Sequence, residues 1–179
     1  MMRLSFNLNG QPVELDCPPD RRLLDIVRES FSLTAAKPGC EIGRCGACVV
    51  WLDGAPANAC LIMAATLQGR RVDTYESVCR SDASTAVRDA LANCGGLQCG
   101  YCTPGIAMTL TYLHRRIPCP DAVEAAELAS GNLCRCTGYG GIRRAVVQLF
   151  PAPQQVGVVT CAPCESVSEQ SASAQKPLR

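Results

Sequence analysis

The sequence lacks most of the residues that enzymes use to transform a substrate. Its 179 residues include one histidine, and aromatic residues make up only 4% of the chain. We find no glycine-rich dinucleotide motif after a predicted strand, no phosphate-binding loop and no Ser/His/Asp set. His114 lies in a helical pattern beside Arg115, where a solvated side chain is expected rather than a ligand. The chain is therefore expected to hold no complete active site and no flavin.

Strong charge and long apolar runs are also missing. The formal net charge is +1, and with so few aromatic residues this argues against nucleic acid as a partner. No segment approaches the roughly 18 consecutive apolar residues of a membrane span. Polar residues such as Arg3 and Asn7 interrupt the N-terminal stretch, so we expect no export signal. A reducing cytoplasm is the expected location.

Cysteine, in contrast, is abundant. There are 14 cysteines, and without an export signal they favour metal binding over disulfides. Eight fall into two sets of four, a first set of Cys40, Cys45, Cys48 and Cys60 and a second set of Cys99, Cys102, Cys134 and Cys136. Six lie outside both patterns: Cys17, Cys79, Cys94, Cys119, Cys161 and Cys164.

The first set has the spacing of a plant-type [2Fe-2S] site. Four residues separate its first two cysteines, two separate the next pair, and the fourth is distant. Gly39, Gly43 and Gly46 alternate with the ligands, so the backbone can adopt positive φ and approach the inorganic sulfides. The alternative is structural zinc, because Cys-x2-Cys pairs are common zinc hooks. The glycine-rich run favours iron and sulfur.

The second set is less decisive by spacing alone. QCGYC contains a hook of the zinc type, but Cys134 and Cys136 are separated by one residue, which constrains a tetrahedral single-metal site. A cluster with two irons accommodates this spacing better. The sequence therefore predicts an electron carrier with two [2Fe-2S] clusters, and a zinc-stapled interaction module remains an alternative.

The first part of the chain is patterned as strands with one helix. Alternating apolar residues over 2–8, the Asn9-Gly10 turn and apolar residues over 13–15 predict a β-hairpin. An apolar stripe over 22–30 predicts a helix with Asp20 as its N-cap. Further strands are expected over 48–52 and 70–74.

The second part is patterned as four short helices. They are expected over 85–93 with Ser84 as cap, over 105–115 after Pro104, over 122–129 with Asp121 as cap, and over 140–150. The second cysteine set then lies at helix ends, so cluster binding and folding of this bundle are expected to be coupled. The fold class is α+β.

Three segments follow from these patterns, with boundaries 1–76, 77–150 and 151–179. The last is rich in Pro, Ser, Ala and Gln, and it is expected to be disordered or extended on a partner. It contains Cys161 and Cys164, but a lone Cys-x2-Cys pair there is a weak signal. We interpret these two cysteines as incidental.

The cysteine motifs resemble those of a known family. GCEIGRCGACVV, QCGYCTPG and GNLCRCTGYGGI are similar to the small iron-sulfur subunit of the xanthine dehydrogenase/aldehyde oxidase family, the molybdenum hydroxylases. The resemblance runs from about Leu4 to Leu149 and includes all eight ligand positions. It implies an N-terminal β-grasp [2Fe-2S] ferredoxin-like domain followed by a small four-helix [2Fe-2S]-binding domain. Glu41 departs from the family pattern, where many members have a small residue.

The resemblance also implies a function within a complex. Electrons would pass from a molybdenum-pterin site on a large subunit, through the second cluster and then the first, to FAD or another acceptor on a partner. Gln98 and Cys136 would contact the molybdopterin. A xanthine-like purine is the first expectation for the substrate, ahead of other N-heterocycles, aldehydes, carbon monoxide and aromatic acyl-CoA. A free-standing two-cluster ferredoxin is the alternative.

Overall fold

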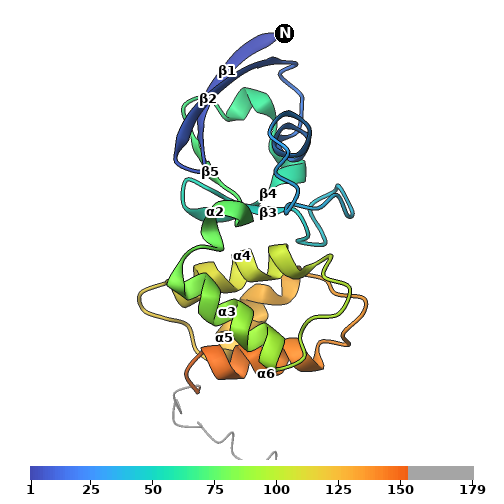
Figure 1. Ribbon diagram of the computed structural model, residues 1–179, viewed down its shortest axis with the longest axis vertical. Helices are drawn as coiled ribbons and strands as arrows, with labels where there is room; N and C mark the ends of the chain where they lie inside the picture. Colours follow the sequence, from blue (N-terminus) through green and yellow to red (C-terminus); the bar gives the residue numbers. More distant parts are fainter. Residues whose placement is uncertain (153–179) are drawn as a thin grey trace, which may run out of the picture.

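The computed structural model describes residues 1–152, which form a sheet-containing unit and a helical unit stacked along the long axis (Figure 1). The sequence expectations for the tail after residue 152, including Cys161 and Cys164, lie outside the described residues. No helix among residues 1–152 combines the length and apolar character needed to cross a membrane.

The first unit is built on one mixed sheet of five strands in the order β2-β1-β5-β3-β4. The predicted hairpin pairs β1 with β2 from Met2 opposite Cys17 to Leu8 opposite Gln11, and β5 joins β1 in parallel. This mixed sheet agrees with the predicted β-grasp arrangement. The strand bounds are β1 (Met2–Leu8), β2 (Gln11–Cys17), β3 (Val49–Leu52), β4 (Ala55–Asn58) and β5 (Arg71–Asp73).

The helix predicted over 22–30 is present, but its start and geometry differ from the prediction. It consists of α1 (Leu23–Asp25) and a π-helical turn, Ile26–Ser30. Asp20 does not cap it: Arg22 occupies the N-cap position without a side-chain hydrogen bond. The N–H of Leu23 instead donates to the carbonyl of Ile62 at 2.7 Å, so a distant segment satisfies the helix start.

The second unit consists of helices, with α4 against the sheet (Figure 1). Eight of the twelve α4 residues are buried, which fits a helix that contacts both β3 and α3. Helical bounds in this part of the chain are α2 (Tyr75–Val78), α3 (Asp82–Asn93), α4 (Thr103–His114), α5 (Ala122–Leu128) and α6 (Gly140–Leu149).

Two of the predicted helix starts were wrong. The cap of α3 is Ser81, whose side chain accepts a hydrogen bond from the N–H of Ser84, and Ser84 itself is buried. Helix α4 starts at Thr103 rather than 105, with Cys102 at its N-cap. The prediction for α5 was correct, because Asp121 accepts hydrogen bonds from two N–H groups of its first turn.

Each unit has its own hydrophobic core, and a smaller cluster joins them. Trp51 from β3, Val78 from α2 and Met108 from α4 form this joining cluster. The Trp51 indole N–H donates to the Met108 carbonyl at 3.2 Å, and the residue is 6% exposed. Trp51 is thus a packing residue that holds the sheet against α4.

Candidate metal centres

The loop that carries the first cysteine set has the predicted positive φ at two of its three glycines, and Gly39 is instead at a close approach to a sulfur. Gly43 and Gly46 have φ of +75° and +67°, which side-chain-bearing residues rarely adopt. A Cβ on Gly39 would lie 2.7 Å from the Cys45 sulfur. Glu41 also has positive φ, and its carboxylate accepts a hydrogen bond from Arg22 at 2.7 Å. A side chain at any of the three glycines would meet neighbouring atoms closer than 3 Å, so the loop conformation favours glycine at these positions.

The four sulfurs of the first set form two pairs. Cys40 and Cys45 contact each other near the surface, whereas Cys48 and Cys60 contact each other in the interior, where they are 3% and 2% exposed. A hydrogen bond from the backbone at Ile42 lowers the pKa of the Cys40 thiol to about 7. Burial raises the pKa of Cys48 to about 12, so this sulfur needs a bound cation to ionise at neutral pH.

The second set also consists of two pairs. The Cys99 and Cys136 sulfurs lie 3.5 Å apart on the surface, and Cys102 contacts Cys134 underneath. Burial raises the pKa of Cys102 to about 12. Burial also acts to raise the pKa of Cys134, but hydrogen bonds from Thr137 outweigh it and the pKa is lowered.

The grouping of the cysteines bears on the two kinds of metal site considered from the sequence. A structural zinc site needs four ligands around one ion, whereas a [2Fe-2S] cluster divides four thiolates between two irons. The paired sulfurs and the glycine-lined loop therefore fit two [2Fe-2S] clusters.

The two cysteine sets face a common cavity of about 210 Å³. Its lining includes two cysteines of the first set and all four of the second: Cys40, Cys45, Cys99, Cys102, Cys134 and Cys136. The backbone also joins the sets, because the N–H of Leu133 donates to the carbonyl of Cys45 at 2.9 Å. Groups bound at the two sets would be neighbours.

Several residues around the sulfurs were not singled out from the sequence. The Thr137 hydroxyl donates to the Cys134 sulfur at 3.1 Å, and the Tyr139 hydroxyl accepts from the Cys134 N–H at 2.9 Å. On the first set, Asn58 lies 3.9 Å from the Cys48 sulfur. Thr137 and Tyr139 had a sequence signal, since they lie one and three residues after Cys136.

The two residues predicted to contact a pterin lie at the exposed edge of the second set. Gln98 precedes Cys99 and is exposed, and Cys136 is exposed beside the Cys99 sulfur. A partner can therefore approach both residues from outside the chain.

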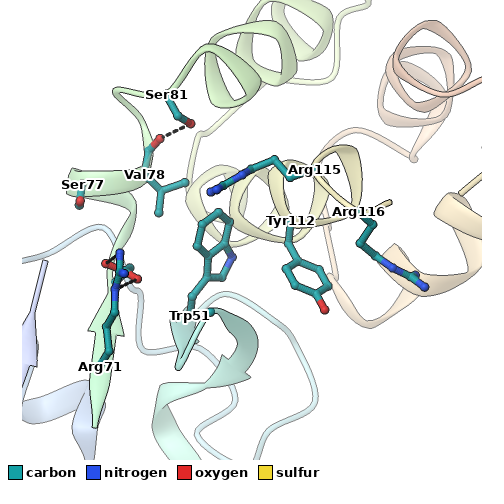
Figure 2. Close-up of a pocket in the computed structure, with 10 residues that line it drawn as sticks. Trp51, Arg71, Ser77, Val78, Ser81, Tyr112, Arg115 and Arg116 are labelled. Atoms are coloured by element: carbon teal, nitrogen blue, oxygen red, sulfur yellow. Dashed lines mark hydrogen bonds and ion pairs between the residues drawn. The ribbon is translucent and has the colours of Figure 1, made fainter. Parts of the chain in front are cut away.

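A larger cavity, of about 480 Å³, lies between the two units at the other end of α4 (Figure 2). Arg115 stacks over the Trp51 ring at 5.3 Å, and Arg71 pairs with Asp73 at 2.9 Å. Its lining contains no cysteine. We therefore do not assign a metal centre to it.

The remaining cysteines are expected to be dispensable for iron binding. Cys17 is buried in the first core, Cys79 and Cys94 are half-buried, and Cys119 is exposed. Serine or alanine at each of these positions, or at Cys161 and Cys164, should leave the iron content unchanged, with a cost of about 1–3 kcal/mol at buried sites from lost packing. Iron analysis and thermal unfolding of six single variants check this. Loss of half the iron in any variant would mean that the ligands are wrongly assigned.

Comparison with known families agrees with this geometry. A family described as "2Fe-2S iron-sulfur cluster binding domain" matches residues 6–84, and one described as "[2Fe-2S] binding domain" matches residues 74–147. The two matches cover the first and second cysteine sets respectively.

Full-length relatives are subunits of dehydrogenases. The chain is 43% identical over 144 residues to a probable xanthine dehydrogenase subunit of Bacillus subtilis, covering 80% of this chain and 83% of that one. It is 40% identical to the nicotinate dehydrogenase small FeS subunit of Eubacterium barkeri, covering 80% and 91%. A chain of quinoline 2-oxidoreductase from Pseudomonas putida 86 matches with a TM-score of 0.72 and 39% identity, covering 82% and 90%. The chain belongs to the small iron-sulfur subunits of the xanthine dehydrogenase/aldehyde oxidase family, and it serves electron transfer through two [2Fe-2S]-binding domains.

Proposed function

We propose that the first cysteine set binds one [2Fe-2S] cluster within residues 1–76 and that the second set binds another within residues 77–150. Within each set, the contacting sulfurs would share an iron. The pairs are Cys40 with Cys45, Cys48 with Cys60, Cys99 with Cys136, and Cys102 with Cys134. The observation that carries this assignment is geometric: two cysteines of the first set and all four of the second line one cavity, and the Cys99 and Cys136 sulfurs lie 3.5 Å apart.

Each bound cluster would supply a site that accepts and releases one electron. The residues of this chain position and stabilise the thiolates. The Arg44 N–H donates to the Cys40 sulfur at 3.1 Å, and Thr137 donates to Cys134. Such donors lower the cost of negative charge on sulfur and thereby tune the reduction potential. Burial of Cys48 and Cys60 keeps water from one side of the first site.

The proposed direction of electron transfer rests on the family resemblance, and the exposed edge of the second set, with Gln98 and Cys136, supports it. We propose that a large subunit with molybdenum-pterin docks at Gln98 and Cys136, and that the pterin contacts both residues. FAD on a further subunit, or another acceptor, would receive electrons from the first set. Since free thiols and clusters are favoured by reducing conditions, we place the complex in the cytoplasm.

The substrate proposed for the complex is an N-heterocycle, with a xanthine-like purine as the first choice. The matched proteins include dehydrogenases named for xanthine, nicotinate and caffeine, all of which are nitrogen heterocycles. The substrate pocket would lie on the large subunit. Turnover assays of the purified complex with xanthine, nicotinate and an aldehyde test this choice, and oxidation of the aldehyde alone would contradict it.

Iron content tests the assignment directly. The chain reconstituted without oxygen is expected to bind about four irons and about four sulfides, since eight thiolates suit two clusters. Metal and acid-labile sulfide analysis, together with visible absorption, checks this result. Stoichiometric zinc and a colourless protein from the native source would contradict it. Isolation of the chain without any large molybdenum protein would favour the free-standing ferredoxin.

A further inference from the structure

Asn132 lies at the contact between the two units, where its side chain is buried. The residue is 6% exposed, and its side-chain amide donates to the Gly46 carbonyl at 3.1 Å across 86 positions of sequence. Its own N–H donates to Ala129 at 3.0 Å, which holds the residue at the end of the turn after α5. A buried amide that loses its acceptor is costly to leave unpaired, so this bond favours the observed arrangement of the two units.

The hydrogen bond from Leu133 to the Cys45 carbonyl runs beside this contact. Two successive residues, Asn132 and Leu133, thus donate to two successive carbonyls, those of Gly46 and Cys45. Cys45 belongs to the first set, and Cys134 of the second set directly follows Leu133. These two hydrogen bonds therefore connect the backbone at Cys45, a ligand position of the first set, to the segment just before Cys134, a ligand position of the second set.

Close backbone contacts leave the Gly46 peptide little room. A Cβ on Gly46 would lie 2.5 Å from the Asn132 amide nitrogen. On the other side, a Cβ on Gly105 of α4 would lie 2.1 Å from the Gly46 oxygen. Because Cys102 is the N-cap of α4, the Gly46 peptide is held between the segments that carry Cys102 and Cys134. The Asn132 amide is the donor that reaches this carbonyl from the second unit.

We propose that Asn132 is a positioning residue that sets the spacing between the two cluster sites. The inference rests on the proposed ligand assignment. Without the amide donor, the Gly46 carbonyl would keep one donor among residues 1–152, the N–H of Val49 at 3.4 Å. The 45–46 segment would then move away from residues 132–133, and the Leu133 hydrogen bond would open more often. Each cluster would stay bound, but the magnetic and electronic coupling between them would weaken.

Two substitutions in the full chain with both clusters reconstituted test the proposal. Asn132→Ala removes the amide, and Asn132→Asp keeps its size while replacing the donor with an acceptor. We expect the wild-type iron content in both variants. Hydrogen exchange at the Leu133 amide should be about tenfold faster. This is the change expected when the segment loses the stabilisation of one ordinary hydrogen bond, here that of the Asn132 side chain. The spin-spin splitting in the electron paramagnetic resonance spectrum of the fully reduced protein should decrease.

Asn9→Asp is the matched control. The Asn9 amide also donates across a long stretch of sequence, to the Thr74 hydroxyl at 3.1 Å, but this bond lies away from both cysteine sets. The variant should lose stability in the first unit while both the splitting and the Leu133 exchange rate stay at wild-type values. A decrease of the splitting in Asn9→Asp as large as that in the Asn132 variants would overturn the proposal.

The remaining outcomes are also decisive. Unchanged splitting and exchange in both Asn132 variants would show that the residue does not set the spacing. Loss of a cluster in both variants would overturn the proposal too, because Asn132 would then be needed for cluster binding. A wild-type chain without two clusters would instead contradict the proposed ligand assignment.

Discussion

Replacing Cys99 with serine in an assembled complex is expected to stop turnover and to leave the first cluster oxidised when substrate is mixed in rapidly. If the second site lies next to the molybdenum, its loss removes the electron source of the first. Cys99 is exposed, so serine should disturb packing less there than at the buried Cys134. Rapid-freeze electron paramagnetic resonance distinguishes the two clusters and checks the result.

The Cys45→Ser variant is the matching experiment, in which the first cluster is removed instead of the second. Substrate should still reduce the second cluster, while electrons should not reach the final acceptor. Because cluster binding and folding are coupled, retained assembly and loss of only one cluster must be established first for both variants. Prompt reduction of the first cluster by substrate in the Cys99 variant would reverse the proposed order.

Replacing Gly141 with alanine is expected to destabilise the helical unit by about 3 kcal/mol or more and to release the second cluster. The added Cβ would lie 2.1 Å from the Gly95 oxygen and 2.6 Å from the Gly96 nitrogen, and both atoms belong to the backbone. Helix α6 would have to move away from the turn after α3. That turn leads to Cys99, and α6 follows Cys136, so both surface ligands would be displaced.

Gly140→Ala is the control, because it is the neighbouring glycine in the same helix. A Cβ there would meet only an Arg144 side-chain atom, at 3.7 Å, and alanine has the higher helix propensity. Its free energy of unfolding should equal or exceed that of the wild type. Denaturant unfolding and iron analysis compare the two variants. Wild-type stability in Gly141→Ala would mean that the backbone at Gly95 yields easily.

The sequence by itself predicted the features that depend on local pattern. Cysteine spacing predicted both four-sulfur sets. The glycines between the ligands made the prediction stronger for the first set, because a short curled loop restricts residue type at each position. Alternating apolar residues predicted the hairpin of β1 and β2. The Asp121 cap was also predictable, since a cap bonds to N–H groups two and three residues away.

Only the tertiary structure decided the features that depend on distant segments. Helix α1 begins at Leu23 because the Ile62 carbonyl accepts its N–H, and no local pattern around Asp20 contains that partner. Ser81 caps α3 and the equally suitable Ser84 is buried in the helix. The contact of Asn132 with Gly46 was not predictable from local pattern either, because it joins residues 86 positions apart. Packing of the two units decides which sulfurs contact each other. It also decides the distance between the two cysteine sets. Neither can be predicted from local pattern in a single sequence.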